Sequence, residues 1–205
     1  MTRTETILLH RWLAAVPVAL AAAAVAYLLF ANADRKSTSP EDLVRALEQA
    51  REGQWDFAMA GTRAYLLDYP DDPFGHFLLG QCYLYGTRLQ VTMASGELET
   101  ALKLHERTGS LGAMQGRMEP DDFVYRVYNI RAVAELRIVR ESMAYSLPRP
   151  FVVRHLHACL NEIRAGLERF PGDDFLLGMK AEVEQVLEEM NIAPPANPAE
   201  EPRAV

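Results

Sequence analysis

Three side chains in one predicted helix have the chemical types needed to bind a metal. His155, Cys159 and Glu162 occupy positions i, i+4 and i+7 of "HLHACLNE", so they fall on one face of an α-helix. Imidazole, thiolate and carboxylate groups are ligands for zinc and other transition metals. The alternative is a structural one, with a histidine above a core cysteine and beside a surface acid. We favour the structural alternative.

No other pattern in the sequence indicates catalysis or cofactor binding. Cys159 has no orienting third group or oxyanion loop near it in the sequence, and GxxxxGK[ST], GxGxxG and HExxH are all absent. The glycine-rich stretch "GSLGAMQG" does not lead from a strand into a phosphate-binding helix start, so we interpret it as a flexible loop or, alternatively, a partner-binding loop. We therefore expect no enzyme activity, no cofactor and no metal.

Charge and cysteine content narrow the partner classes. The 205-residue chain has a net charge of −7, which disfavours nucleic acid as a partner. Cys82 and Cys159 form no CxxC motif; we expect two buried small hydrophobic residues, although an even pair could bridge in an oxidising compartment. The middle of the chain contains six arginines without intervening lysines: Arg126, Arg131, Arg137, Arg140, Arg149 and Arg154. They could bind an acidic partner or lipid headgroups, or they could form a solvated helix face.

The N-terminal region contains a membrane-length apolar run. Trp12–Ala31 carries no charge over twenty residues, and at 1.5 Å per residue a helix of that length spans about 30 Å, the thickness of a bilayer core. Trp12 and Tyr27 are suited to the two interfaces. We predict a flank over 1–11, an anchor over 12–33 and a linker over 34–40. The alternative is a signal peptide cleaved after Ala33, because Ala31-Asn32-Ala33 has the small-x-small pattern.

The rest of the chain has helical periodicity and no alternating strand pattern. The fold class is therefore all-α. A helical domain is expected over 41–190, followed by a disordered Pro/Ala/Glu tail over 191–205. We predict helices over 41–52, 55–69, 74–85, 97–107, 120–145, 151–170 and 173–190, with a polar stretch at 86–96.

A similar helix break occurs twice. "YPDDPFGHFLLG" and "FPGDDFLLG" both combine an aromatic residue, a proline, an acidic turn and Leu-Leu-Gly. The proline ends one helix, the acidic residues cap the next, and the small glycine allows close helix packing. Pro70 and Pro171 are 101 positions apart (171 minus 70), close to three periods of about 34 residues, which indicates an internal repeat.

Several residues resemble the tetratricopeptide repeat, a 34-residue helix–turn–helix unit. The second half of one unit is matched by Gly53, Trp55, Ala58 and Pro70. The first half of the next unit is matched by Leu79, Gly80 and Tyr83. The second half of that unit follows an insertion around "RLQVTMAS" and is matched by Gly96, Leu98 and Ala101. Residues 120–190 match loosely. The resemblance implies a short α-solenoid with a concave protein-binding face. The transmembrane helix predicted from the apolar run would precede it.

The resemblance also implies where a partner would bind. Concave-face positions of the second unit would be Phe74, Phe77, Gln81, Leu84 and Tyr85. Family members that grip a C-terminal carboxylate have Lys, Arg and Asn there, so we expect no carboxylate clamp. Either an apolar partner segment or the protein's own long helix fills the groove.

A second candidate surface is the arginine-containing part of the long helix. Arg126, Tyr128 and Arg131 combine aromatic and guanidinium groups, which are favoured in interfaces but also occur on ordinary amphipathic helices. We expect a single-pass membrane scaffold, an accessory subunit or assembly factor of a membrane-protein complex. Its domain would lie on the periplasmic side of a bacterium. The alternatives are a soluble periplasmic binding module and, less favoured, a metal protein using His155, Cys159 and Glu162.

Overall fold

The computed structural model describes residues 37–195, and the helices belong to one compact unit that begins at Thr38. The predicted anchor with Trp12 and Tyr27, and residues 196–205 of the predicted tail, lie outside the described residues. Residues 37–195 contain α-helices, one 3-10 helix and no strand, which confirms the all-α class. The elements are α2 (Pro40–Arg51), α3 (Trp55–Asp68), α4 (Pro73–Tyr85), α5 (Val91–Thr108), η1 (Gly112–Met114), α6 (Pro120–Ala144), α7 (Arg149–Arg169) and α8 (Asp174–Glu189).

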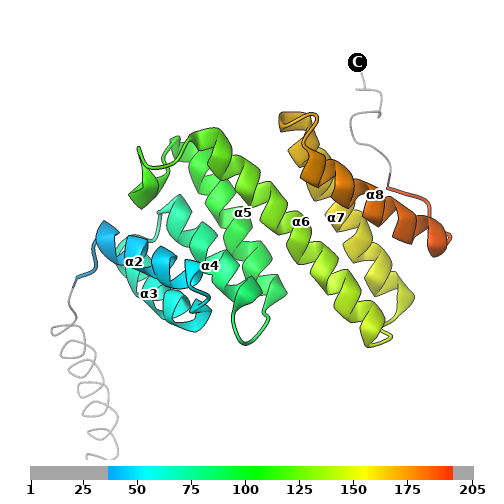
Figure 1. Ribbon diagram of the computed structural model, residues 1–205, viewed down its shortest axis with the longest axis horizontal. Helices are drawn as coiled ribbons and strands as arrows, with labels where there is room; N and C mark the ends of the chain where they lie inside the picture. Colours follow the sequence, from blue (N-terminus) through cyan, green and yellow to red (C-terminus); the bar gives the residue numbers. More distant parts are fainter. Residues whose placement is uncertain (1–36, 196–205) are drawn as a thin grey trace, which may run out of the picture. The chain divides into compact units, whose positions relative to one another are not determined.

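The helices pack as successive hairpins (Figure 1). The most extensive contacts are within the pairs α2–α3, α4–α5 and α6–α7, and each pair then contacts the next helix along the chain. Helix α8 packs on α7 and has no following helix within the described residues. This arrangement is compatible with a helical repeat. Within residues 37–195, no helix combines the length and the apolarity needed to cross a membrane.

Each hairpin begins with a proline at the first helical position. Pro40, Pro73 and Pro120 open α2, α4 and α6. Proline is suited to this position because its fixed φ is already helical and its missing N–H would have no partner there. The residue before each proline is extended, so the chain turns sharply into the helix.

The two similar helix breaks form the same turn. Tyr69 has φ −126° and ψ 63°, and Phe170 has φ −126° and ψ 67°. Asp72 accepts the Gly75 N–H at 2.9 Å, and Asp173 accepts the Leu176 N–H at 2.8 Å. These bonds confirm the prediction that the acidic residues cap the following helices.

The Leu-Leu-Gly triplets that follow these turns are not equivalent. Gly80 lies eight positions after its cap residue Asp72, whereas Gly178 lies five after Asp173. A Cβ at Gly80 would be 2.8 Å from Leu98 Cγ, but a Cβ at Gly178 would have nothing within 4 Å. Close helix packing therefore explains Gly80 and not Gly178, and the prediction is wrong for the second glycine.

Helix α5 begins six residues earlier than predicted. The stretch 86–96 was expected to lie outside the helix, but α5 starts at Val91. Ala94 is fully buried, and its carbonyl oxygen would be 3.2 Å from a Cβ on Gly80. The first turns of α5 are helical because they pack against α4. The inserted loop is thus limited to residues 86–90.

Helix α6 connects two hydrophobic clusters. Phe123, Val124 and Val127 belong to the cluster formed with α2–α5, whereas Leu136 and Val139 belong to the cluster formed with α7 and α8. Its observed bounds agree with the predicted 120–145 helix. One long helix therefore contributes buried side chains to both clusters.

The glycine-rich loop between α5 and α6 is packed rather than flexible. Leu111 and Met114 are buried, and the Ala113 N–H donates to Asp72 Oδ2 at 2.7 Å. Gly112 has φ +58°, and a Cβ there would be 2.1 Å from Asp72 Cγ. The prediction of a flexible loop is therefore corrected, because the hydrogen bond to Asp72 connects the loop to the turn before α4.

Candidate functional site

The predicted partner-binding face of α4 lies mostly inside the protein. Phe74, Phe77 and Leu84 are 1%, 3% and 0% exposed, so these side chains are not available to a partner in this structure. Phe123 of α6 packs edge-on against Phe77, with ring centroids 5.6 Å apart. The long helix fills this groove, which is the second of the two alternatives that the sequence left open. Gln81 and Tyr85 are half-buried.

Tyr85 is the last residue of α4. Its ring is tilted against Trp55 with centroids 5.1 Å apart. Burial raises the pKa of Tyr85, and the positive charge of Arg137 partly offsets this. The ring thus packs on Trp55 of α3 and lies within the influence of the Arg137 charge.

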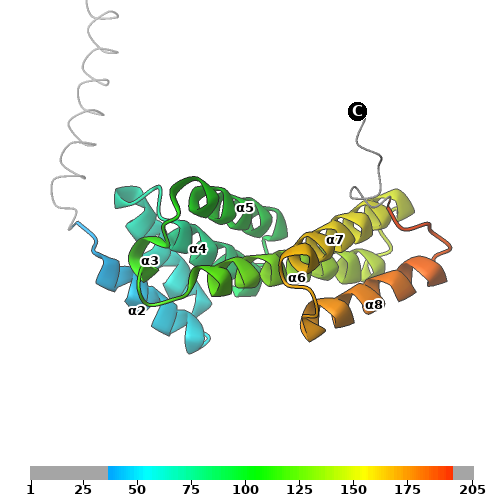
Figure 2. The same ribbon diagram turned by 90° about the horizontal axis from the view of Figure 1, so that it is seen from above.

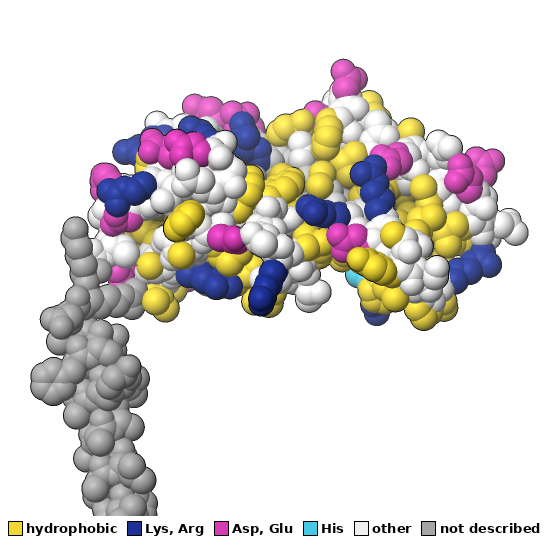
Figure 3. All heavy atoms as spheres, turned by 60° about the horizontal axis from the view of Figure 1, so that its bottom comes forward, with side chains coloured by type: hydrophobic (Ala, Val, Ile, Leu, Met, Phe, Trp, Pro, Cys, Tyr) yellow, Lys and Arg dark blue, Asp and Glu magenta, His cyan; other side chains and the backbone are white. Residues whose placement is uncertain are grey.

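The candidate site is a groove of about 560 Å³ between α6 and α8. Val133, Leu136 and Met179 supply apolar surface, and Phe175 is 48% exposed beside them. Figure 2 shows α8 on the opposite side of α6 and α7 from the α5 layer. Hydrophobic side chains reach the surface between basic and acidic groups on the face drawn in Figure 3. An apolar groove of this size can accept side chains of a protein segment.

Charged side chains form the rim of the groove. Arg140 forms an ion pair with Glu182 across the groove, and Arg137 Nε lies 3.7 Å from Glu141 Oε1. The Arg137 Nη1 also donates to the Leu84 carbonyl at 2.9 Å. A cation is favoured there because the C-terminal end of α4 has a partial negative charge. The groove therefore combines an apolar interior with arginines that already have internal partners.

The position of Phe175 explains why sequence reasoning missed this groove. Phe74 and Phe175 both lie two positions after the cap residue of their helix. Phe74 is covered by the core, whereas Phe175 is exposed, because α8 has no following hairpin within residues 37–195. The repeated turn in the sequence shows that Phe74 and Phe175 occupy equivalent positions, but it does not show which of the two side chains is exposed to solvent.

Most of the six arginines contact a neighbouring helix. Five of them have internal partners: Arg131 with Glu162 at 2.7 Å, Arg137 with Leu84, Arg140 with Glu182, Arg149 with the Met190 carbonyl, and Arg154 over the Phe151 ring. Of the predicted trio on α6, Arg126 is exposed and Tyr128 is half-buried beside Gly166 of α7. The trio therefore does not present one continuous surface.

The candidate metal-ligand trio His155, Cys159 and Glu162 contacts α6 through three separate interactions. His155 Nδ1 is 2.7 Å from Glu135 Oε2, the Cys159 thiol donates to the Ala132 carbonyl at 3.3 Å, and Glu162 pairs with Arg131. Burial raises the pKa of Cys159 to about 12, which keeps it a thiol. These contacts support the structural interpretation. Within residues 37–195, no three His, Cys, Asp or Glu side chains are grouped to hold a metal.

One further group was not singled out from the sequence. His76 Nδ1 is 2.6 Å from Glu97 Oε2, and His76 Nε2 is 2.8 Å from the Pro70 carbonyl. Both partners are acceptors, so the ring satisfies both only when it carries two protons. Burial lowers the pKa of His76, but these two bonds outweigh it and the pKa is raised. Cys82 and Cys159 are both free and buried, as predicted.

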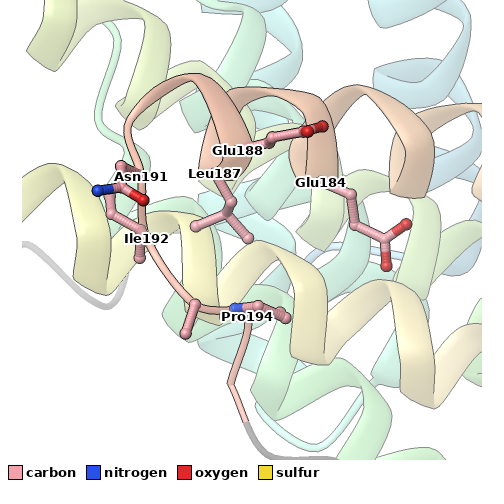
Figure 4. A pocket seen from close by; sticks show the side chains of 7 residues that line it. Glu184, Leu187, Glu188, Asn191, Ile192 and Pro194 are labelled. Carbon is pink, nitrogen blue, oxygen red and sulfur yellow. The ribbon is translucent and has the colours of Figure 1, made fainter.

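The first residues of the predicted tail are fixed against α7. His157 Nε2 is 3.1 Å from the Ala193 carbonyl, and Arg164 Nη1 donates to the Pro195 carbonyl at 2.9 Å. Figure 4 shows the pocket of about 510 Å³ formed where this segment leaves α8, next to Leu187 and Ile192. Residues 191–195, the first part of the predicted tail, thus contact α7.

Comparison with known proteins places the chain in no family. No protein-family profile matches the sequence. No curated protein matches it either. The fold and the groove therefore carry the functional conclusion.

Proposed function

We propose that this protein is a membrane-anchored scaffold that binds a partner protein in the groove between α6 and α8. One observation carries the proposal: Phe175 is 48% exposed at the edge of a groove lined by Val133, Leu136 and Met179. Exposed aromatic anchors beside an apolar pocket are typical of protein-binding surfaces. Binding, and not catalysis, is the activity that this arrangement supports.

The chemistry of the groove indicates the kind of segment it takes. An apolar side chain of the partner would pack on Phe175 and Met179, while its polar groups would face Arg137, Arg140 and Glu182. The arginines already have internal partners, so a partner need not supply a carboxylate. A short amphipathic helix meets these requirements.

The uncharged run Trp12–Ala31 supports membrane attachment of this scaffold. Attachment would confine the groove near other membrane proteins and raise their effective concentration, so a modest interface would suffice. The protein would then act as an accessory subunit or assembly factor, with its domain on the periplasmic side. Its partners would be membrane proteins of a larger complex.

A matched pair of variants tests the groove. Tagged full-length protein is purified from its native membranes in mild detergent, and co-purifying proteins are identified by mass spectrometry. We expect Phe175→Asp to remove the partner set. Leu177→Asp should keep it, because Leu177 has similar exposure (44%) on the same helix but does not line the groove. Unchanged recovery with Phe175→Asp and an unchanged melting temperature would refute this binding site.

The pattern Ala31-Asn32-Ala33 favours a second candidate, a soluble periplasmic binding module. Cleavage after Ala33 would leave Asp34 as the mature N-terminus. N-terminal sequencing of protein from the membrane and soluble fractions distinguishes the two. A soluble protein beginning at Asp34 would replace the anchored scaffold with the released module.

A further inference from the structure

Helix α3 is apolar on two sides. Its inner side, with Ala58, Met59 and Tyr65, is buried against the core. On its outer side Phe57 and Leu67 are 69% and 68% exposed, the largest exposures of large apolar side chains within helices of residues 37–195. Ala60 and Ala64 lie between them at helical spacing, the first exposed and the second half-buried. Isolated exposed apolar residues are ordinary, but a stripe of this length on one helix indicates a contact surface.

The other two second helices of the hairpins do not share this property. The outer side of α7 carries residues 191–195 through His157 and Arg164. Exposed positions of α5 are mainly polar: Thr92, Glu99, Lys103, Glu106 and Arg107. The apolar stripe is therefore a specific feature of α3 and not a consequence of the repeat architecture.

The spacing of the stripe makes it complementary to itself. Phe57 and Leu67 are each five positions from residue 62, and Ala60 and Ala64 are each two positions from it. If two α3 helices pack antiparallel about a two-fold axis at this level, Phe57 faces Leu67 of the partner subunit. Ala60 then faces Ala64 of the partner subunit. Small residues at the centre allow the helix axes to approach closely, and the large residues close both ends.

The chain enters the domain at one end of this surface. The Thr38 N–H and hydroxyl donate to Asp68 at 2.8 and 2.7 Å, and the Tyr69 hydroxyl donates to the Thr38 carbonyl. The chain thus reaches the domain at the end of α3 that carries Leu67. The six residues 32–37 separate the uncharged run from Thr38, and they span at most about 20 Å.

We propose that the outer face of α3 binds a second copy of this chain, as an antiparallel helix pair centred on residue 62. The inference rests on the proposed membrane anchor, because one pair of 14-residue helices buries less than the roughly 1,200 Å² of a stable interface. Two anchored copies are confined to the same layer, and confinement compensates for a small contact. The dimer leaves the groove between α6 and α8 uncovered by this contact, since α3 does not line that groove.

Disulfide crosslinking in native membranes tests the orientation of the pair. Full-length Phe57→Cys and Leu67→Cys chains with different tags are expressed separately and together, then oxidised with copper phenanthroline. We expect the mixed pair to crosslink roughly ten-fold more than either variant alone, because like positions would lie about 15 Å apart along the axis and a disulfide needs Cα atoms within about 7 Å. Cys82 and Cys159 are buried and stay unreactive.

Two controls keep the test interpretable. A second reporter pairs an Ala60→Cys chain with an Ala64→Cys chain. Adding Leu67→Glu to both chains should abolish this crosslink, whereas adding Met93→Glu on α5 should leave it unchanged. If the mixed pair does not crosslink although the protein is in the membrane fraction, the dimer is refuted and the anchor stands. If the protein is soluble, the anchor fails, and crosslinking at high protein concentration decides the α3 contact separately. Equal crosslinking of like and mixed pairs would refute the antiparallel arrangement.

Discussion

The Tyr65 hydroxyl donates to Asp72 Oδ2 at 2.7 Å, and the same oxygen accepts the Ala113 N–H. The other carboxylate oxygen caps α4 through Gly75. One buried carboxylate therefore joins α3, α4 and the glycine-rich loop. Burial and the Asp72 carboxylate raise the pKa of Tyr65, which favours the protonated phenol that donates this bond.

We expect Asp72→Ala to lower the free energy of unfolding by about 3 kcal/mol, because it removes a helix cap and leaves the buried Tyr65 hydroxyl and Ala113 N–H without their acceptor. Asp173→Ala is the matched control. Asp173 occupies the same turn and caps α8, and its carboxylate also interacts with the half-buried Tyr125. Within residues 37–195 no loop N–H donates to this carboxylate, so its loss should cost about 1 kcal/mol. Urea denaturation followed by circular dichroism measures both. Equal costs would show that the loop bonds contribute nothing.

Gly112→Ala should destabilise the protein by about 2–3 kcal/mol, because a side chain is strained at positive φ and would overlap the Asp72 carboxylate. Gly109→Ala separates the two effects. Gly109 also has positive φ (+66°), but a Cβ there would meet nothing within 4 Å, so only about 1 kcal/mol of backbone strain is expected. Limited trypsin digestion at Arg117 reports whether the loop has been released. An unchanged cleavage rate in the Gly112 variant would contradict the packed loop.

Stability should decrease as the pH rises through neutrality because of His76. Its folded pKa is raised, since the bonds to Glu97 and Pro70 outweigh the effect of burial. A raised folded pKa means that the stabilisation is complete below the unfolded value of about 6.5 and is lost as the pH rises through the folded pKa.

Denaturation at pH 6, 7 and 8 measures this dependence. We expect His76→Gln to flatten the profile over this range and to cost about 1–2 kcal/mol at pH 6, where the charged ring makes both bonds. Glu97→Gln should weaken the dependence by removing the carboxylate. A His76→Gln profile parallel to the wild type would show that another group sets the dependence.

Arg137→Ala should cost about 1–2 kcal/mol, because it removes a charged donor from the C-terminal carbonyl of α4 at Leu84. Arg126→Ala is the control on the same helix, where an exposed side chain should change stability by less than about 0.5 kcal/mol. Thermal melting compares the two. If both variants melt alike, Arg137 does not connect α6 to α4 in solution.

Helix positions and caps followed from local chemistry. Prolines 40, 73 and 120 open helices, and Asp72 and Asp173 cap them, because these effects depend on residues within one turn of the chain. The start of α5 was misplaced for the opposite reason. Residues 91–96 have weak local helix signals, and they are helical because Ala94 packs against Gly80.

The sequence by itself determined the all-α class, the order of the helices and the repeated turn at Tyr69 and Phe170, since each depends on short-range periodicity and backbone preference. The tertiary structure alone decided which apolar side chains stay open. Phe74 and Phe175 follow the same turn, yet only Phe175 is exposed, because neighbours distant in sequence cover Phe74. Likewise, the arginines of the middle region became helix connectors only when folding brought Leu84, Glu162 and Glu182 within reach. Burial and pairing depend on contacts between distant segments, and local sequence patterns do not encode those contacts.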